Sequence, residues 1–270
     1  MIRHSAGQDW LLFTQHDHAL LSGRLAEQFG NEKFAKPSPQ AIQGVALHDC
    51  GWPLHDDRPT LNAKGEPLHV FESPVWIGVQ VWSASARRAA NKEPYAGMLA
   101  SIHGMHLATF VGQFQKTQRD HFELNKFQHD QVELQEKIRR SLHMRLDIPV
   151  NHGLAKAGVR PEEDQLRFDY HLLRAMDQVS LALLCSETPF DAIELEPRPG
   201  ADPVRLRLDP SGSFSVRIDP WPFAIAPLVF NVPCRRMTAN TFSDVETFRN
   251  AYDDAPSEQV EVTVAPASSG

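Results

Sequence analysis

The chain has no long hydrophobic run and no run of basic residues. No segment approaches the roughly 20 apolar residues that a membrane-spanning helix needs, and the N-terminal residues lack the apolar core of a signal peptide. We therefore expect a cytoplasmic protein with no membrane contact. The net charge of -7 and the pI near 6.0 give no general attraction for a phosphate backbone, so nucleic acid is not expected as a partner.

Cysteine is also scarce. Cys50, Cys185 and Cys234 are odd in number, far apart and in no CxxC pair, which argues against a disulfide framework and against a thiolate zinc site. Any metal ion must then be bound by nitrogen and oxygen ligands. Histidine, by contrast, is abundant: 13 of 270 residues is about twice the share we expect of an ordinary soluble domain. This excess indicates that some histidines have a chemical role.

The first 190 residues carry the apolar periodicity of helices. Asp17 is placed to cap the first helix, and Ser38 followed by Pro39 is a standard helix start. Pro161, followed by three acidic residues, opens a long later helix. Other helices are predicted after Pro74, after Pro94 and over the charged residues 119–145, and residues 52–73 are expected to form an irregular loop beside the site.

Beyond residue 190 the period of the apolar residues changes to two. Residues 204–208 and 214–218 flank a Pro-Ser-Gly-Ser turn and predict a hairpin, and residues 260–264 alternate as a final strand. The sequence therefore predicts a mainly α protein. We expect a helical domain over residues 1–190 and a small β-rich extension over residues 191–270 packed on it.

The pair His48-Asp49 ends an apolar helix and precedes Gly51 and Trp52. Neighbouring helical residues point about 100° apart, so both side chains can reach one ion only if it lies beside the helix end. The alternative is a surface or capping pair.

Asp177 lies within a helix whose neighbours are mostly leucine and other core residues. Burying an unpaired carboxylate costs several kcal/mol, which a metal ion or a cation would offset. The alternatives are a partly exposed aspartate, or one bonded to a buried histidine or arginine. His18 opens the first helix, where an early ligand could be fixed; an exposed histidine there is a better description of His16.

The ordered pattern His, His-Asp, Asp, each on a separate predicted helix, resembles the HD superfamily of metal-dependent phosphohydrolases. The segment 48–52 resembles its HD-x-G element. More narrowly, the chain resembles an uncharacterised bacterial family known only as a domain of unknown function, DUF3891. The stretches that carry this narrower resemblance are residues 14–19, 48–52, 101–103, 177–180 and 220–223.

The resemblance implies an HD-type helical bundle in which His18, His48, Asp49 and Asp177 bind a divalent transition metal. Mn, Fe, Zn, Ni and Co all suit such ligands. His103 is the first candidate ligand of a second ion, so one or two ions are expected, and His48, Asp49 and His103 are the candidate catalytic residues. His55, His69, His106 and His171 are weaker candidates for the site, and the histidines at 121, 129 and 143 are expected on a solvated face.

The leading functional hypothesis is hydrolysis of a small phosphoester or nucleotide by a metal-activated water. One alternative is an HD-type di-iron oxygenase, which requires a fuller set of second-metal histidines. Another is a non-catalytic, metal-stabilised module that binds a protein through its β-rich extension or the helix over residues 119–145. The expected partner is a small phosphorylated molecule, and a homo-oligomer is possible. Arg58, Lys64, Arg87, Arg88 and Arg174 are available to bind phosphate, and no spacing rule selects one of them.

Overall fold

The computed structural model describes residues 1–145, 160–186, 191–239 and 241–267. Its elements in chain order are β1 (Ile2–Ala6), β2 (Asp9–Phe13), α1 (Gln15–Gln28), α2 (Pro39–Leu47), α3 (Pro53–Asp56), the 3-10 turn η1 (Val70–Glu72), α4 (Val75–Lys92), α5 (Pro94–Gly112), α6 (Gln118–Ser141), α7 (Pro161–Leu184), β3 (Ala192–Leu195), β4 (Val204–Gly212), β5 (Ser215–Asp219), β6 (Leu228–Met237), α8 (Val245–Asp254) and β7 (Ser257–Pro266).

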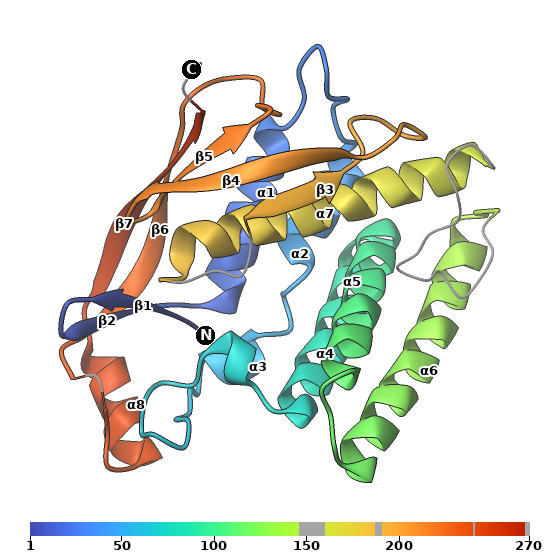
Figure 1. Ribbon diagram of the computed structural model, residues 1–270. Helices are drawn as coiled ribbons and strands as arrows, with labels where there is room; N and C mark the ends of the chain where they lie inside the picture. The colour runs from blue at the N-terminus through green and yellow to red at the C-terminus, as the bar shows by residue number, and fades with distance from the viewer. Residues whose placement is uncertain (146–159, 187–190, 240, 268–270) are drawn as a thin grey trace.

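The strands form one curled seven-stranded sheet in the order β1-β2-β6-β7-β5-β4-β3 (Figure 1). Neighbouring strands are antiparallel except β5 and β7, which pair in parallel. Apolar residues on the inner face of the sheet pack with α1 and α7 into one large core. Its members include Phe13, Leu25, Phe168, Leu206 and Val262.

The expected fold class is wrong: the protein is neither all-α nor a mainly α bundle with a small β appendage, because the sheet is one of its principal layers. The missed part lies at the N-terminus. Residues 2–13 form the hairpin of β1 and β2, and β2 pairs with β6 through Trp10 and Met237. A pairing over so many residues leaves no local pattern in the sequence. The expected hairpin of residues 204–218 is confirmed as β4 and β5. Strands come from both sides of residue 190, and the division into two domains stays a prediction.

Helices α1, α2, α4, α5, α6 and α7 form layers on the inner side of the sheet, whereas α8 packs through Phe248 and Tyr252 on Leu12 and Met237. Helices α1 and α7 contact the sheet, α2 and α5 contact the other side of this pair, and α4 and α6 pack on α5 (Figure 1). None of the described helices is long and apolar enough to cross a membrane. Helix α7 therefore lies between the sheet and the outer helices, in contact with both.

Local signals explain where these helices start. Ser38 caps α2, with Pro39 in its first position, as the sequence predicts. Helix α1 differs by three residues from its prediction, because the hydroxyl of Thr14 accepts the N–H of Asp17 and is therefore the cap. The loop over residues 52–73 contains two short helical elements, α3 and η1.

Candidate metal centre

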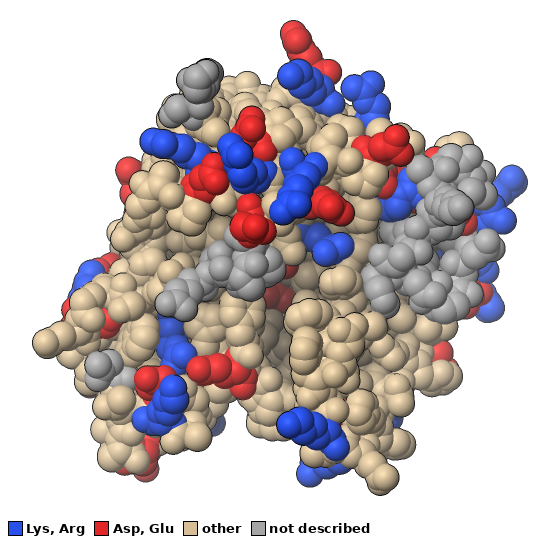
Figure 2. Space-filling model, in the orientation of Figure 1, with Lys and Arg blue, Asp and Glu red and all other residues tan. Residues whose placement is uncertain are grey.

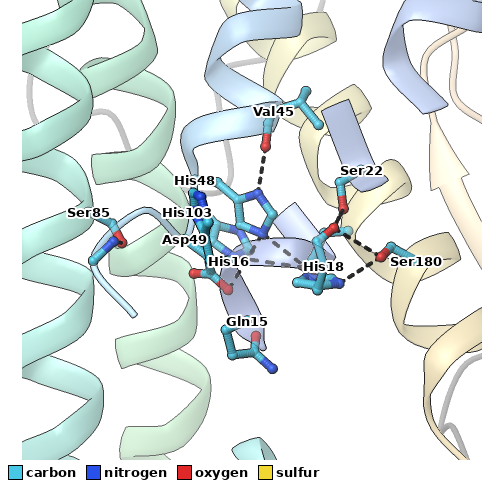
Figure 3. A network of polar contacts seen from close by, with 12 residues as sticks. Gln15, His16, His18, Ser22, Val45, His48, Asp49, Ser85, His103 and Ser180 are labelled. Carbon is cyan, nitrogen blue, oxygen red and sulfur yellow. Dashed lines mark hydrogen bonds and ion pairs between the residues drawn. The ribbon is translucent and has the colours of Figure 1, made fainter. Parts of the chain in front are cut away.

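Five side chains singled out in the sequence lie between α1, α2, α5 and α7, in two overlapping groups that share His48. Figure 3 labels four of them: His18, His48, Asp49 and His103. His18 lies in the first turns of α1, and His48 and Asp49 follow the last turn of α2. His103 lies in the middle of α5 and Asp177 in the second half of α7. Four of the five are buried, with exposed fractions of 1% for His18, 2% for His48, 4% for His103 and 6% for Asp49.

The donor atoms are close enough to share an ion. Asp177 Oδ1 lies 2.9 Å from His18 Nε2 and 3.6 Å from His48 Nε2, and Asp49 Oδ2 lies 3.7 Å from His48 Nε2. Ligand atoms at about 2.0–2.2 Å from one ion are about 3.3–3.6 Å apart in a tetrahedron and about 2.8–3.1 Å apart at right angles. The contacts of Asp177 with His18 and His48, and of Asp49 with His48, are therefore near the spacing of ligands that share an ion. His103 Nε2 is 3.9 Å from Asp177 Oδ2, on the other oxygen of that carboxylate.

Hydrogen bonds fix the ring of His18. The hydroxyl of Ser180 donates to the main-chain carbonyl of His18 at 3.1 Å and lies 2.7 Å from His18 Nδ1. With its one proton on that carbonyl, the hydroxyl accepts from Nδ1–H. The Nε2 atom of a neutral ring then carries a lone pair and faces an Asp177 carboxylate oxygen at 2.9 Å. Two acceptors at this distance need a cation between them, either a proton or a metal ion.

His48 is oriented in the same way. Its Nδ1–H donates to the carbonyl of Val45 at 2.7 Å, one turn back in α2 (Figure 3). This bond leaves Nε2 as the free nitrogen, and Nε2 is buried without a hydrogen-bond partner among the described residues. Its ring lies between those of His18 and His103, with centroids 5.4 and 5.2 Å away. A second-nitrogen bond of this kind is what usually orients a metal-binding histidine.

The charges of the cluster are strongly perturbed. Burial opposes the charge on His48, but the Asp49 and Asp177 carboxylates raise its pKa to about 9. Burial raises the pKa of Asp49, whereas the contacts of Asp177 with His18 and His48 overcome the effect of burial and hold its pKa well below the ordinary value. Burial lowers the pKa of His103 to about 3. Without a metal, a protonated His48 thus lies beside the carboxyl groups of Asp49 and Asp177.

Gly51 brings the His48-Asp49 segment against α4. Its N–H donates to Ser85 Oγ at 2.9 Å, and a Cβ at this position would lie 2.2 Å from the Val81 carbonyl oxygen and 2.6 Å from the Ser85 nitrogen. Such distances are impossible between real atoms, so only glycine allows this contact. The close packing of this segment on α4 therefore explains why the HD-x-G-like segment has a glycine at position 51.

The surface near the cluster is hollowed. Asp177 is more exposed than the histidines, with 14% of its side chain accessible. In the space-filling view a hollow opens between the sheet side and the helices, and acidic atoms lie at its bottom (Figure 2).

The sequence matches one family over most of its length. The family described as "Protein of unknown function (DUF3891)" covers residues 1–239. The chain belongs to this family. No curated protein and no solved structure matches it significantly. The DUF3891 part of the expected resemblance is confirmed, whereas no comparison supports membership of the HD superfamily.

The weaker histidine candidates of this DUF3891 chain lie outside the cluster. His69 caps η1 and lies 4.0 Å from Cys185 Sγ, and His171 Nδ1 lies 3.7 Å from a Glu196 oxygen. His106 lies one turn beyond His103, beside the ring of Tyr170. His55 bonds to Gln80, and on α6 His129 is exposed beside Glu133.

Two residues that support the cluster were not assigned from the sequence. Ser180 lies three residues after Asp177, and this spacing puts both on the same face of α7. The sequence therefore contains a signal for Ser180. It contains none for Asp56, because the role of Asp56 depends on a contact between α3 and α1: its carboxylate accepts the first N–H groups of α1 and anchors the helix that carries His18.

Proposed function

We propose that this protein is a divalent-metal-dependent hydrolase of a small phosphoester or nucleotide. His18, His48, Asp49 and Asp177 would hold one ion, and His103 is the candidate ligand of a second. The observation that carries the proposal is the meeting of two imidazole nitrogens, both oriented by bonds at their other nitrogen, with the buried carboxylate of Asp49 and the partly buried carboxylate of Asp177. Such ligand sets suit transition metals.

The order of these ligands along the chain supports a chemistry of the HD type. His18 comes from α1, the His48-Asp49 pair from the end of α2, and Asp177 from the distant helix α7. This similarity concerns the ligands and not the whole fold.

An ion bound at the cluster would supply a water of lowered pKa and would polarise a phosphoryl oxygen. The residues of the chain provide the geometry. Ser180 and the Val45 carbonyl keep the two rings turned toward the ion, and the buried Asp49 carboxylate is available to hold or accept a proton from that water. His103 Nε2 lies on the Asp177 side, where it would contact a second ion or the leaving group.

The test begins with metal. Protein purified without chelator is analysed for transition metals, and its melting temperature is compared before and after chelation. Phosphomonoesters, cyclic nucleotides and nucleotides are then offered as substrates. We expect His48→Gln and Asp49→Asn to lose both metal and hydrolysis.

The matched control is His129→Gln, because His129 is an exposed histidine on α6 with 74% of its side chain accessible. It should keep both properties. Folded His48→Gln and Asp49→Asn variants with wild-type rates would contradict the proposal. Two irons per chain with an oxygen-dependent absorption change would favour the oxygenase instead, and tightly bound metal without any turnover would favour the non-catalytic module.

A further inference from the structure

The face of α7 that carries the metal-ligand candidate Asp177 also carries an arginine and a tyrosine. Tyr170, Arg174 and Asp177 are spaced i, i+4 and i+7, so they lie in one row along the helix. Asp177 belongs to the cluster, and Arg174 is one helical turn away from it. Tyr170 is fully buried, whereas Arg174 is half-buried.

Arg174 is not held by a carboxylate. Its guanidinium lies over the ring of Tyr170, 5.9 Å from the centroid, and within the described parts of the chain no acidic group forms an ion pair with it. Arg167, earlier on the same helix, is different: it donates to Asp164 at 2.6 Å and to Glu196. Arg167 therefore connects α7 to the sheet, while the hydrogen-bonding groups of Arg174 remain available.

The backbone of α7 places Arg174 close to the cluster. Its Cα lies three residues, less than one turn, before that of Asp177. Asp177, the most exposed member of the cluster, is the one nearest to Arg174 along the helix. The guanidinium itself lies over Tyr170, toward the start of α7, so a ligand bound at Asp177 would reach it by extending along the helix in that direction.

We infer that Arg174 binds the non-bridging oxygens of a phosphomonoester whose phosphorus lies at the cluster. The inference rests on the proposed function and names its substrate class. A guanidinium presents paired donors that match two phosphoryl oxygens, and the ring of Tyr170 below it limits its motion. Since it carries no structural ion pair, binding an anion breaks none.

The test measures the binding of inorganic phosphate by calorimetry, with and without Mn²⁺, in the full chain. We expect Arg174→Gln to weaken phosphate binding at least tenfold, which is about 1.4 kcal/mol, without weakening Mn²⁺ binding. Arg174→Lys should lose at least threefold, because an ammonium group cannot form the bidentate pair. This variant carries the test if the glutamine variant does not fold.

Arg24→Gln is the matched control. Its guanidinium also lies over an aromatic ring, that of Phe230 at 4.6 Å, but on the side of α1 that faces β6. It should bind phosphate as the wild type does. The inference is wrong if folded Arg174→Gln binds phosphate within twofold of the wild type, if its Mn²⁺ affinity falls by the same factor, or if the wild type binds no phosphate.

The same measurements distinguish a failure of the proposed function from a failure of the inference about Arg174. A wild-type chain that takes up no metal but binds phosphate through Arg174 would refute the metal centre and leave this inference intact.

Discussion

Metal binding at the cluster should release protons, because protons on the histidines and the metal compete for the same nitrogen atoms. The carboxylates raise the pKa of His48 to about 9 despite its burial. At pH 7, two units lower, about 99% of His48 is protonated, so each ion should displace about one proton from it. His103, with a pKa of about 3, adds none.

This competition also sets the direction in which the apparent metal affinity changes with pH. Below pH 9 each proton displaced makes the apparent metal affinity rise about tenfold per pH unit, and the rise ends once His48 is neutral. Calorimetry of Mn²⁺ binding at pH 7, in buffers of different ionisation enthalpy, counts the protons directly. We expect about one per ion in the wild type and the same number in His103→Gln. An enthalpy independent of the buffer, in a protein that binds one ion, would refute this account of the cluster.

Two further predictions concern the structure around the cluster. Gly51→Ala places a methyl group on main-chain atoms of α4, 2.2 Å from the Val81 oxygen; we expect a loss of about 1–3 kcal/mol in thermal melts and weaker metal binding. Gly112→Ala, where the added Cβ meets only one side-chain atom at 3.6 Å, should be close to neutral, and equal melting of the two variants would contradict the packing role of Gly51. Tyr95→Phe removes the 2.6 Å hydrogen bond to the buried Asp169, whose pKa burial raises to about 6. Because the carboxylate is ionised above that pH, urea unfolding should show a loss of about 1–3 kcal/mol at pH 8 and a smaller one at pH 5; equal losses would contradict a titration of Asp169 between these two pH values.

The candidate cluster was predictable because each of its members has a local signal. Asp177 stands out as an acid within an apolar helical period, and His48-Asp49 as a pair at a helix end before a glycine. The order of the pattern along the chain did not depend on knowing the fold. The sequence could not show which groups bind the Nδ1 atoms of the histidines. The bond between Ser180 and His18 Nδ1, for example, forms only when α1 and α7 lie side by side.

The sheet was underestimated for a related reason. Strands β1 and β2 are five residues long, and β2 pairs with a strand more than two hundred residues away. The alternation of β1 is also hidden, since the inward position between Ile2 and Ala6 is occupied by a histidine, His4. Helix α8 was missed as well, although Asp244 caps it.

His4 shows why the sheet matters for the cluster. Its ring stacks on Phe214 of the sheet side with centroids 4.1 Å apart, and its Nδ1–H donates to the carbonyl of Leu184 at 3.1 Å. Leu184 is the last residue of α7, the helix that carries Asp177 and Ser180. The N-terminal hairpin thus binds the end of α7, while the ion pairs of Arg167 bind its other half to the residue that follows β3. Because α7 is attached to the sheet at both places, the sheet fixes the position of Asp177 relative to His18, and it is part of the support of the site rather than an extension of it.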